Sequence, residues 1–410
     1  MIWGTGLSKQ EGLFYGWKVV GALFVMLAFS SGLGFYGHSI ILQALVRESG
    51  FDVELASSAV SLFFLVSGLT GLIIAQLIER IDIRIVIIIG AVLASTSLWM
   101  IGSVSTDVEL FSVYVIFGVG WSASGLLPAT TLIARWFQSN RAKALSIAST
   151  GLSVGGITVT PLMAFLVDEY SLAAVSPILG LIYLVGILPV TWFVLRSSPA
   201  DVGLNPDGAN GSAQKSGILL LDAVRHPFFW SLSIAYVLVM AAQVGGIAHQ
   251  FGVLIERVTA TQATYGIAIL PAASVVGRLV GGMILDRIST LRFALVMMAL
   301  QATSLFIVGS STSVVTLFLA LGLFGVSVGN LLMLPPLIIA EVYGLANYSQ
   351  IYSWSNLITM LGVAGGPVLM GILFSVSGSY HVPYIIAAAL GLSAAIVFML
   401  FTPPRNGQGE

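Results

Sequence analysis

The chain has 410 residues, of which 57% are hydrophobic and only 8% are charged. Soluble domains carry about 25% charged residues, so this composition excludes a soluble globular protein and predicts an integral membrane protein. The formal net charge of -1 indicates no nucleic-acid partner, and the absence of cysteine excludes disulfides, thiol catalysis and cysteine-ligated metals.

Long apolar runs follow one another along nearly the whole chain. A helix needs about 20 apolar residues to cross a bilayer, and twelve runs reach that length. The first, Val19 to Leu45, is too long for a signal-peptide core and has no cleavage pattern after it, so it predicts a span rather than a removed leader. The predicted spans cover residues 15–45, 55–78, 83–104, 108–134, 141–167, 173–196, 228–256, 262–285, 292–311, 313–340, 348–376 and 381–402.

One connection between the predicted spans is long and polar. Residues 197–227 are rich in Gly, Ser, Asn, Asp and Pro, a composition typical of linkers. The segment divides the spans six and six, into an N-terminal bundle over 1–196 and a C-terminal bundle over 228–410. The predicted fold is therefore an all-α membrane protein with twelve transmembrane helices in two pseudo-symmetric halves.

The distribution of basic residues orients the spans. With a cytoplasmic N-terminus, most of the 16 Lys and Arg residues fall on the cytoplasmic side, while Arg47 and Arg257 fall on the other. Cytoplasmic loops carry an excess of Lys and Arg, whereas the reverse orientation would invert this bias. We therefore expect a multi-pass protein of the inner (plasma) membrane, with the lipid bilayer around it and both termini and the linker in the cytoplasm.

The two halves share sequence features at one constant offset. Repeated halves are typical of secondary transporters, whose site lies near the midplane between the halves. The matched positions are Glu79 with Asp286, Arg80 with Arg287, and Pro128 with Pro335. The acidic–basic pairs follow the second and eighth spans, where they predict a gating lock that holds one face closed until the halves rock. Ordinary interfacial charge is the alternative interpretation.

Arg278 is the one Lys or Arg residue that lies away from the ends of a predicted span. It lies eight residues before Asp286, so at ~1.5 Å per residue it is roughly 12 Å inside the membrane boundary. A guanidinium at that depth keeps its charge and must meet an anion, a carbonyl or water. It corresponds to Gly71 in the repeat, so one half carries the charge alone. It is either a structural arginine paired with a neighbouring helix or an anchor for an anionic substrate.

Two histidines and several polar or aromatic side chains also lie within the spans. His38 and His249 are each roughly 12 Å below the opposite boundary, where an imidazole can carry a proton or donate to a substrate oxygen. They can equally form hydrogen bonds between helices. Candidates for lining a substrate cavity, each also compatible with ordinary packing, are Tyr36, Trp121, Asn330, Tyr352 and Asn356.

Three features together resemble a known family. Tyr15-Gly16-Trp17-Lys18 opens the first span, the run from Ala134 to Leu145 opens the fifth, and Arg278 lies in the eighth. These features are similar to those of the monocarboxylate transporter family and the related oxalate/formate antiporters, which belong to the major facilitator superfamily. The resemblance covers essentially the whole chain. It implies a major facilitator fold, a small organic carboxylate anion as cargo, and Arg278 as the carboxylate anchor.

The chain also departs from these families. Ser274 stands where animal members have an Asp, and the position of the antiporters' second cation in the eleventh span is occupied by Ser355 or Asn356. The first-span Lys of animal members is missing, and His38 lies near its place. One fixed cation favours a monoanion over a dicarboxylate. The proton carrier is then His249, His38 or the substrate itself.

The residues therefore predict a secondary active transporter, not an enzyme, that moves a small organic monocarboxylate with a proton by alternating access. We expect a monomer without metal or cofactor. An organic anion exchanger, a drug/proton antiporter and a non-transporting carboxylate sensor remain alternatives. Drug antiporters usually carry an acidic residue within a span, and here only the span-end residues Glu256 and Glu341 qualify.

Overall fold

The computed structural model describes residues 14–208, 218–285, 287–344 and 347–403. Within these residues twelve helical spans are long and apolar enough to cross a membrane, which confirms the predicted fold class. Large apolar side chains cover the outside of the bundle, as in Phe193 and Leu319, which are 71% and 65% exposed. Such a surface is stable only in lipid.

The first six spans form what we call the N-half. Several are made of two or three helical pieces. Their elements are α1 (Tyr15–Ser30), the π-helix η1 (Ser31–Phe35), α2 (His38–Ser49), α3 (Val53–Arg80), α4 (Ile83–Met100), η2 (Ile101–Ser103), α5 (Asp107–Ser124), α6 (Leu126–Trp136), α7 (Arg141–Tyr170), α8 (Leu172–Pro189) and η3 (Val190–Val194).

The last six spans form the C-half. A connection that contains η4 (Pro199–Val202) and α9 (Leu220–Arg225) precedes them. Their elements are α10 (Pro227–Ala248), α11 (Gln250–Arg257), α12 (Ala260–Gly266), α13 (Ile269–Leu285), α14 (Thr290–Ser310), α15 (Val314–Leu331), α16 (Leu334–Tyr343), α17 (Tyr348–Ser377) and α18 (His381–Met399).

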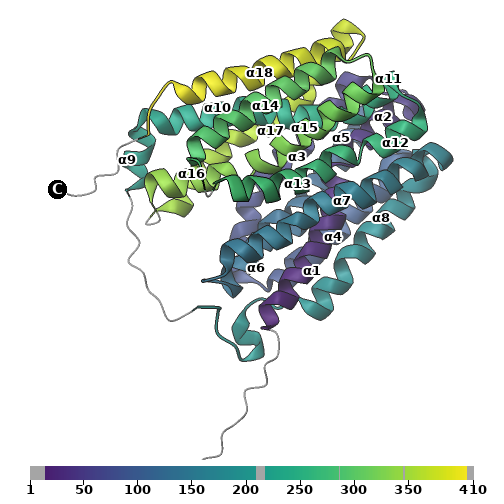
Figure 1. The fold of residues 1–410 in the computed structure, drawn as a ribbon. Helices are drawn as coiled ribbons and strands as arrows, with labels where there is room; N and C mark the ends of the chain where they lie inside the picture. Colours follow the sequence, from purple (N-terminus) through teal and green to yellow (C-terminus); the bar gives the residue numbers. More distant parts are fainter. Residues whose placement is uncertain (1–13, 209–217, 286, 345–346, 404–410) are drawn as a thin grey trace, which may run out of the picture.

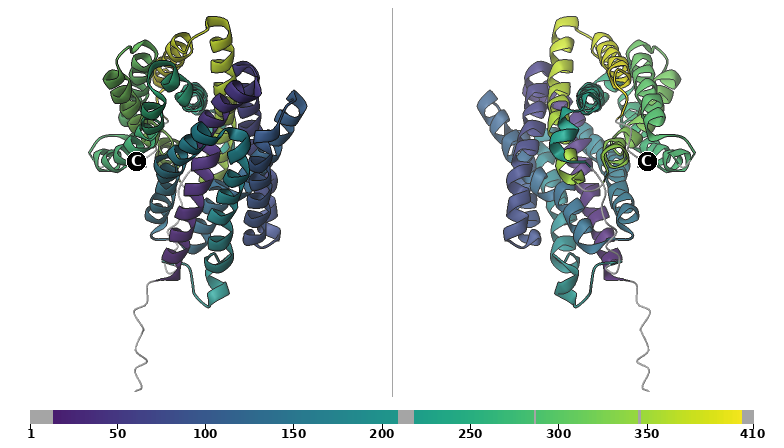
Figure 2. Two further views of the ribbon diagram at one scale, coloured as in Figure 1. Left: turned by 90° about the vertical axis from the view of Figure 1, so that its right-hand side faces the viewer. Right: turned by 90° about the vertical axis from the view of Figure 1, so that its left-hand side faces the viewer.

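The two halves converge at one end of the bundle and separate at the other (Figure 1). One end of the bundle carries α6, α9 and α16, and we call it the linker end. At the other end α2 lies beside α11, and we call this the far end. The two side views show the same grouping of the helices into halves (Figure 2).

Two pairs of helices form the main contact between the halves, α3 with α17 and α7 with α13. Along α3, Ser57 and Ser61 contact α17 near the far end, and Gly68 approaches Met360 further in. Every hydrogen bond that joins the halves within the described residues lies between the far end and the level of Arg278. The conformation is therefore closed at the far end.

Several spans are interrupted, although the sequence predicts each as one continuous helix. The first changes to a π-helix at Ser31–Phe35, the fourth breaks at Gly125, and the seventh breaks at His249. An uninterrupted apolar run gives no signal for such a break, because the freed backbone groups are satisfied by neighbouring helices. Interrupted helices of this kind commonly surround the binding sites of transporters.

Candidate functional site

Arg278 lies on α13 at the boundary between the halves, half-buried at the inner limit of their contact. Its Nε donates to the carbonyl of Gly329 on α15 at 3.3 Å. Nη1 donates to the carbonyl of Ser149 at 3.3 Å and Nη2 to the hydroxyl of Ser153 at 3.2 Å, both on α7 of the N-half. The guanidinium is thus held from both halves at once.

The charge of Arg278 is balanced by neutral acceptors only. No carboxylate pairs with it among the residues that the structure describes. A guanidinium carries five N–H donors in a rigid plane, and its three bonds leave one donor on each terminal nitrogen. A carboxylate can accept two N–H bonds, so an anion of that kind could use the two remaining donors.

Ser153 and Ser274 form a short relay beside the guanidinium. Their hydroxyl oxygens are 2.8 Å apart, both side chains are fully buried, and Ser274 donates to the carbonyl of Pro271. Ser153 therefore donates to Ser274 and accepts from Arg278, which satisfies each hydroxyl. Tyr36, also buried, interacts electrostatically with Arg278. The relay and the tyrosine close the site on its far-end side.

Asn330 supports the site without touching its charge. Its amide nitrogen donates to the carbonyls of Gly277 and Val326 at 2.9 Å, which ties α15 to α13. A side chain at Gly281 would collide with the amide oxygen of Asn330, and one at Gly329 would collide with the backbone of Ser274. Small residues let these helices approach closely, and this approach places the Gly329 carbonyl within reach of Arg278.

His249 lies in the far-end contact and does not touch Arg278. It connects α10 to α11 and is fully buried. Its Nε2 is 3.2 Å from the Ser57 hydroxyl and 3.1 Å from the Pro367 carbonyl, and its Nδ1 is 3.4 Å from the Tyr380 hydroxyl. Its predicted role in substrate or proton binding therefore remains a prediction, at a different position from Arg278.

His38 is enclosed by aromatic rings in the core of the N-half. It is fully buried, with the ring of Phe63 at 4.2 Å between centroids, Phe117 at 5.5 Å and Tyr114 stacked at 5.6 Å. Neither ring nitrogen has a hydrogen-bond partner among the described residues. The structure does not bring His38 into contact with Arg278, and its predicted role in binding and proton coupling stays a prediction.

The other predicted lining residues belong to separate surroundings. Trp121 donates from Nε1 to the Ser30 carbonyl at 3.1 Å, within the N-half. Tyr352 and Asn356 are half-buried on α17, where Tyr352 interacts with Tyr236 of α10. None of these three contacts Arg278 within the described part of the chain. Among the predicted lining residues, Tyr36 interacts with Arg278 electrostatically, and Asn330 bonds the carbonyl of Gly277, the residue before Arg278.

Three of the four predicted gating residues lie within the described part of the chain. Glu79, Arg80 and Arg287 are exposed at the linker end and make no ion pair with another described residue. Asp286 lies outside the described residues. The gating role therefore remains a prediction.

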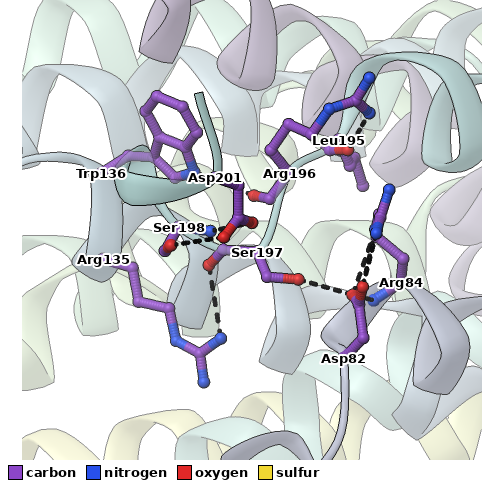
Figure 3. Close-up of polar contacts among 9 residues, drawn as sticks. All are labelled: Asp82, Arg84, Arg135, Trp136, Leu195, Arg196, Ser197, Ser198 and Asp201. Atoms are coloured by element: carbon purple, nitrogen blue, oxygen red, sulfur yellow. Dashed lines mark hydrogen bonds and ion pairs between the residues drawn. The ribbon is translucent and has the colours of Figure 1, made fainter. Parts of the chain in front are cut away.

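A different charged cluster occupies the linker end of the N-half (Figure 3). Asp82 caps α4 and forms an ion pair with Arg84 at 2.6 Å, and it accepts a hydrogen bond from Ser197 at 2.5 Å. Arg135 donates to the carbonyls of Ser197 and Ile78. The cluster fastens the segment after the sixth span to the second and third spans, which makes this end of the N-half one unit.

The cluster predicts a pH effect on stability. Hydrogen bonds from Arg84, and then from Ser197, lower the pKa of Asp82 to about 2, against an opposing effect of partial burial. A carboxylate with a depressed pKa stabilises the fold above the unfolded value of about 4, and this contribution disappears as the pH falls toward 2. Asp82→Asn should therefore lower the melting temperature at neutral pH. Thermal unfolding in detergent should show the gap to wild type narrowing between pH 4 and pH 3, and a gap independent of pH would contradict the assignment.

Comparison with known proteins identifies the family. The model of the Major Facilitator Superfamily matches residues 24–255 and 241–410. The chain belongs to this superfamily. Monocarboxylate transporter 11 of Mus musculus is 23% identical over 404 residues, which are 94% of this chain and 87% of that protein. The Bacillus subtilis MFS-type transporter YcxA is 27% identical over 183 residues, 43% of this chain and 45% of that protein.

The fold is shared with solved transporters of the superfamily. A bacterial homologue of the human lysosomal transporter Spinster, in an inward-facing and occupied conformation, superposes with a TM-score of 0.73 at 16% identity. The match covers 94% of this chain and 95% of that structure. The relatives are transporters, so this chain is a multi-pass membrane transporter of the superfamily and not an enzyme. Monocarboxylate transporters among its relatives confirm the family resemblance seen in the sequence.

Proposed function

We propose that the protein moves a small organic monocarboxylate across the membrane by alternating access, with Arg278 as the anchor of the carboxylate. The observation that supports this proposal best is the state of the guanidinium. It is fixed by three neutral acceptors from both halves, has no described counterion, and keeps one N–H free on each terminal nitrogen. Such a group favours a bidentate anion.

The cycle follows from the two ends of the bundle. With the linker end in the cytoplasm and the protein in the inner (plasma) membrane, this conformation opens inward. Arg278 lies where the contact between the halves ends, and Ser149 and Ser153 reach it from the opposite half. An anion bound to Arg278 would lie at the contact between the halves. If it binds one conformation more tightly than the other, it shifts the equilibrium between the inward-open and outward-open states.

A single cation limits the charge of the substrate. The groups around Arg278 are a phenol, a serine hydroxyl and backbone carbonyls, and none of them carries a positive charge. A second carboxylate on the substrate would have to be buried without a partner, which is costly. A monoanion therefore fits better than a dicarboxylate, and uptake with a proton makes the transported complex neutral.

Proton-coupled symport remains the favoured coupling, with His249 and His38 as candidate carriers. A proton that travels on the substrate is the alternative, and so is an organic anion exchanger that moves no proton. A drug/proton antiporter fits less well, because the anchor is a cation and no acidic side chain contacts it within the described residues. We propose a monomer, since each chain contains both halves of the site.

Counterflow in proteoliposomes tests the proposal. Labelled lactate, pyruvate, oxalate and an aromatic monocarboxylate are offered with and without a pH gradient. We expect exchange of one or more monocarboxylates, weaker exchange of oxalate, and accumulation only when the pH gradient is present. Exchange of oxalate alone would point to a dicarboxylate exchanger. Exchange that is never accompanied by proton-driven accumulation would indicate an anion exchanger.

A further inference from the structure

A chain of hydrogen bonds crosses the boundary between the halves at the far end. The Gln43 side chain on α2 donates to the Tyr380 hydroxyl at 2.7 Å, and Tyr380 lies 3.4 Å from Nδ1 of His249. Nε2 of His249 then reaches Ser57 on α3. This series of hydrogen bonds therefore begins in the N-half at Gln43 and ends in the N-half at Ser57, with the C-half residues Tyr380 and His249 between them.

The acceptors around His249 define its protonation state. The Pro367 carbonyl, 3.1 Å from Nε2, can only accept, so Nε2 carries a hydrogen. Ser57 donates its own hydrogen to the Val53 carbonyl, so its oxygen also accepts from Nε2. In a neutral ring Nδ1 is then the acceptor, and Tyr380 donates to it. All donors and acceptors match only when His249 is neutral.

Gly252 and Pro367 shape the backbone around these hydrogen bonds. Gly252 of α11 leaves room for the pair, because a side chain there would displace the Tyr380 hydroxyl and the Gln43 amide. Pro367 interrupts the hydrogen-bond ladder of α17, and the backbone beside it contacts two side chains. Its carbonyl meets His249, and the next N–H, of Val368, donates to Ser61 of the N-half at 2.9 Å.

We infer that His249 is a proton-sensitive lock of the far-end gate. A proton added to Nδ1 places two donors, N–H and the Tyr380 O–H, against each other. Tyr380 must then turn its hydrogen away, and its oxygen becomes the acceptor for both Nδ1 of His249 and the Gln43 amide, so the Gln43–Tyr380 bond between the halves is weakened. Protonation therefore weakens the closed far end and favours its opening, whatever anion the protein carries. On the proposed orientation, an acidic exterior opens the transporter outward.

No other ionisable group around this chain is bonded to His249 within the described residues. The nearby groups each have their own partners or face solvent. Glu256 accepts from the backbone N–H of Tyr380, Arg257 donates to the carbonyls at the end of α14, Tyr384 donates to the Gly246 carbonyl, Arg47 pairs with Glu48 and Asp168, and Asp52 and Glu54 are exposed at the start of α3.

Distance measurements between spin labels test the lock without substrate. The chain has no native cysteine, so Ser49→Cys and Ser377→Cys introduce two label sites, both exposed at the far end and one in each half. Double electron–electron resonance is recorded at pH 8 and pH 5. We expect the short-distance population to dominate at pH 8 and the ratio of long- to short-distance populations to rise roughly three- to tenfold at pH 5, the effect of about one net hydrogen bond.

Matched variants separate the lock from general acid effects. In His249→Gln the distances should no longer respond to pH, whereas His381→Gln should respond as wild type does, because the His381 ring bonds the Gly309 carbonyl of its own half and no N-half residue among those described. Tyr380→Phe should show the longer distance already at pH 8, and Tyr384→Phe should not. A full pH response in His249→Gln, or none in wild type, would overturn the inference. The labels report on the gate without substrate. An unchanged pH response in Arg278→Ala would therefore show that the His249 lock does not depend on Arg278 as the carboxylate anchor.

Discussion

Replacing Arg278 with lysine is expected to reduce uptake of the substrate at least about tenfold while the protein still folds and inserts. Lysine keeps the charge but loses the planar guanidinium, which can donate two parallel hydrogen bonds to a carboxylate. A hydrogen bond to a charged group contributes roughly 1.5–3 kcal/mol, which corresponds to about ten- to a hundredfold in affinity. Initial rates of labelled uptake in proteoliposomes, at several substrate concentrations, measure the effect.

Arg278→Ala removes both the charge and the fork, so it should abolish specific uptake. Its amount in the membrane and its melting temperature in detergent provide the control for folding. Arg292→Ala is the matched control for loss of an arginine, because Arg292 is exposed at the start of α14 and its side chain forms no ion pair with another described residue. Normal uptake kinetics in well-expressed Arg278→Ala would eliminate the anchor.

Ser274→Asp should turn the site into one that binds its anion only at acidic pH. Ser274 lies one helical turn before Arg278 and is fully buried against Ser153. Residues four apart on a helix face each other, so the new carboxylate would pair with Arg278 and compete with the substrate. We expect the KM for uptake at pH 7 to rise at least about tenfold, on the scale of one charge-assisted hydrogen bond. Acidification that protonates the carboxylate should restore it.

Ser274→Asn has nearly the same shape without the charge and is the control. It should keep a KM within about threefold of wild type across the same pH range, since a lost neutral hydrogen bond contributes about 1 kcal/mol. If the Asp and Asn variants behave alike, the effect is steric. The position would then have no electrostatic connection to Arg278.

The sequence was most informative about the spans and the anchor. Length and apolarity alone predict twelve spans, and the spans of the structure begin and end within a few residues of the predictions, except that the seventh ends at Ala248 and not at 256. Arg278 stands out because a charge within an apolar helix is costly and needs a specific partner. The site's acceptors were not predictable in the same way. Ser149 and Gly329 act through backbone carbonyls, which every residue has.

Ser153 and the position of His249 show where sequence reasoning ended. Ser153 lies among the small residues of α7, a composition that helix packing already explains, so nothing in it points to a hydrogen bond with Arg278. His249 and Arg278 are at different depths along neighbouring spans, and only the arrangement of the helices places the histidine in the far-end contact. The departure at Ser274 was visible in the sequence, but its bond to Ser153 required the fold.

Binding of an acid and its amide to the purified protein tests the role of Arg278 most directly. Isothermal titration compares a transported monocarboxylate with the corresponding uncharged amide, in wild type and in Arg278→Ala. Wild type should bind the acid and bind the amide at least about tenfold more weakly, because the amide lacks the charge that strengthens both hydrogen bonds. Arg278→Ala should bind neither measurably. Equal affinity of wild type for the acid and the amide, or unchanged affinity of Arg278→Ala for the acid, would contradict a carboxylate anchor at Arg278.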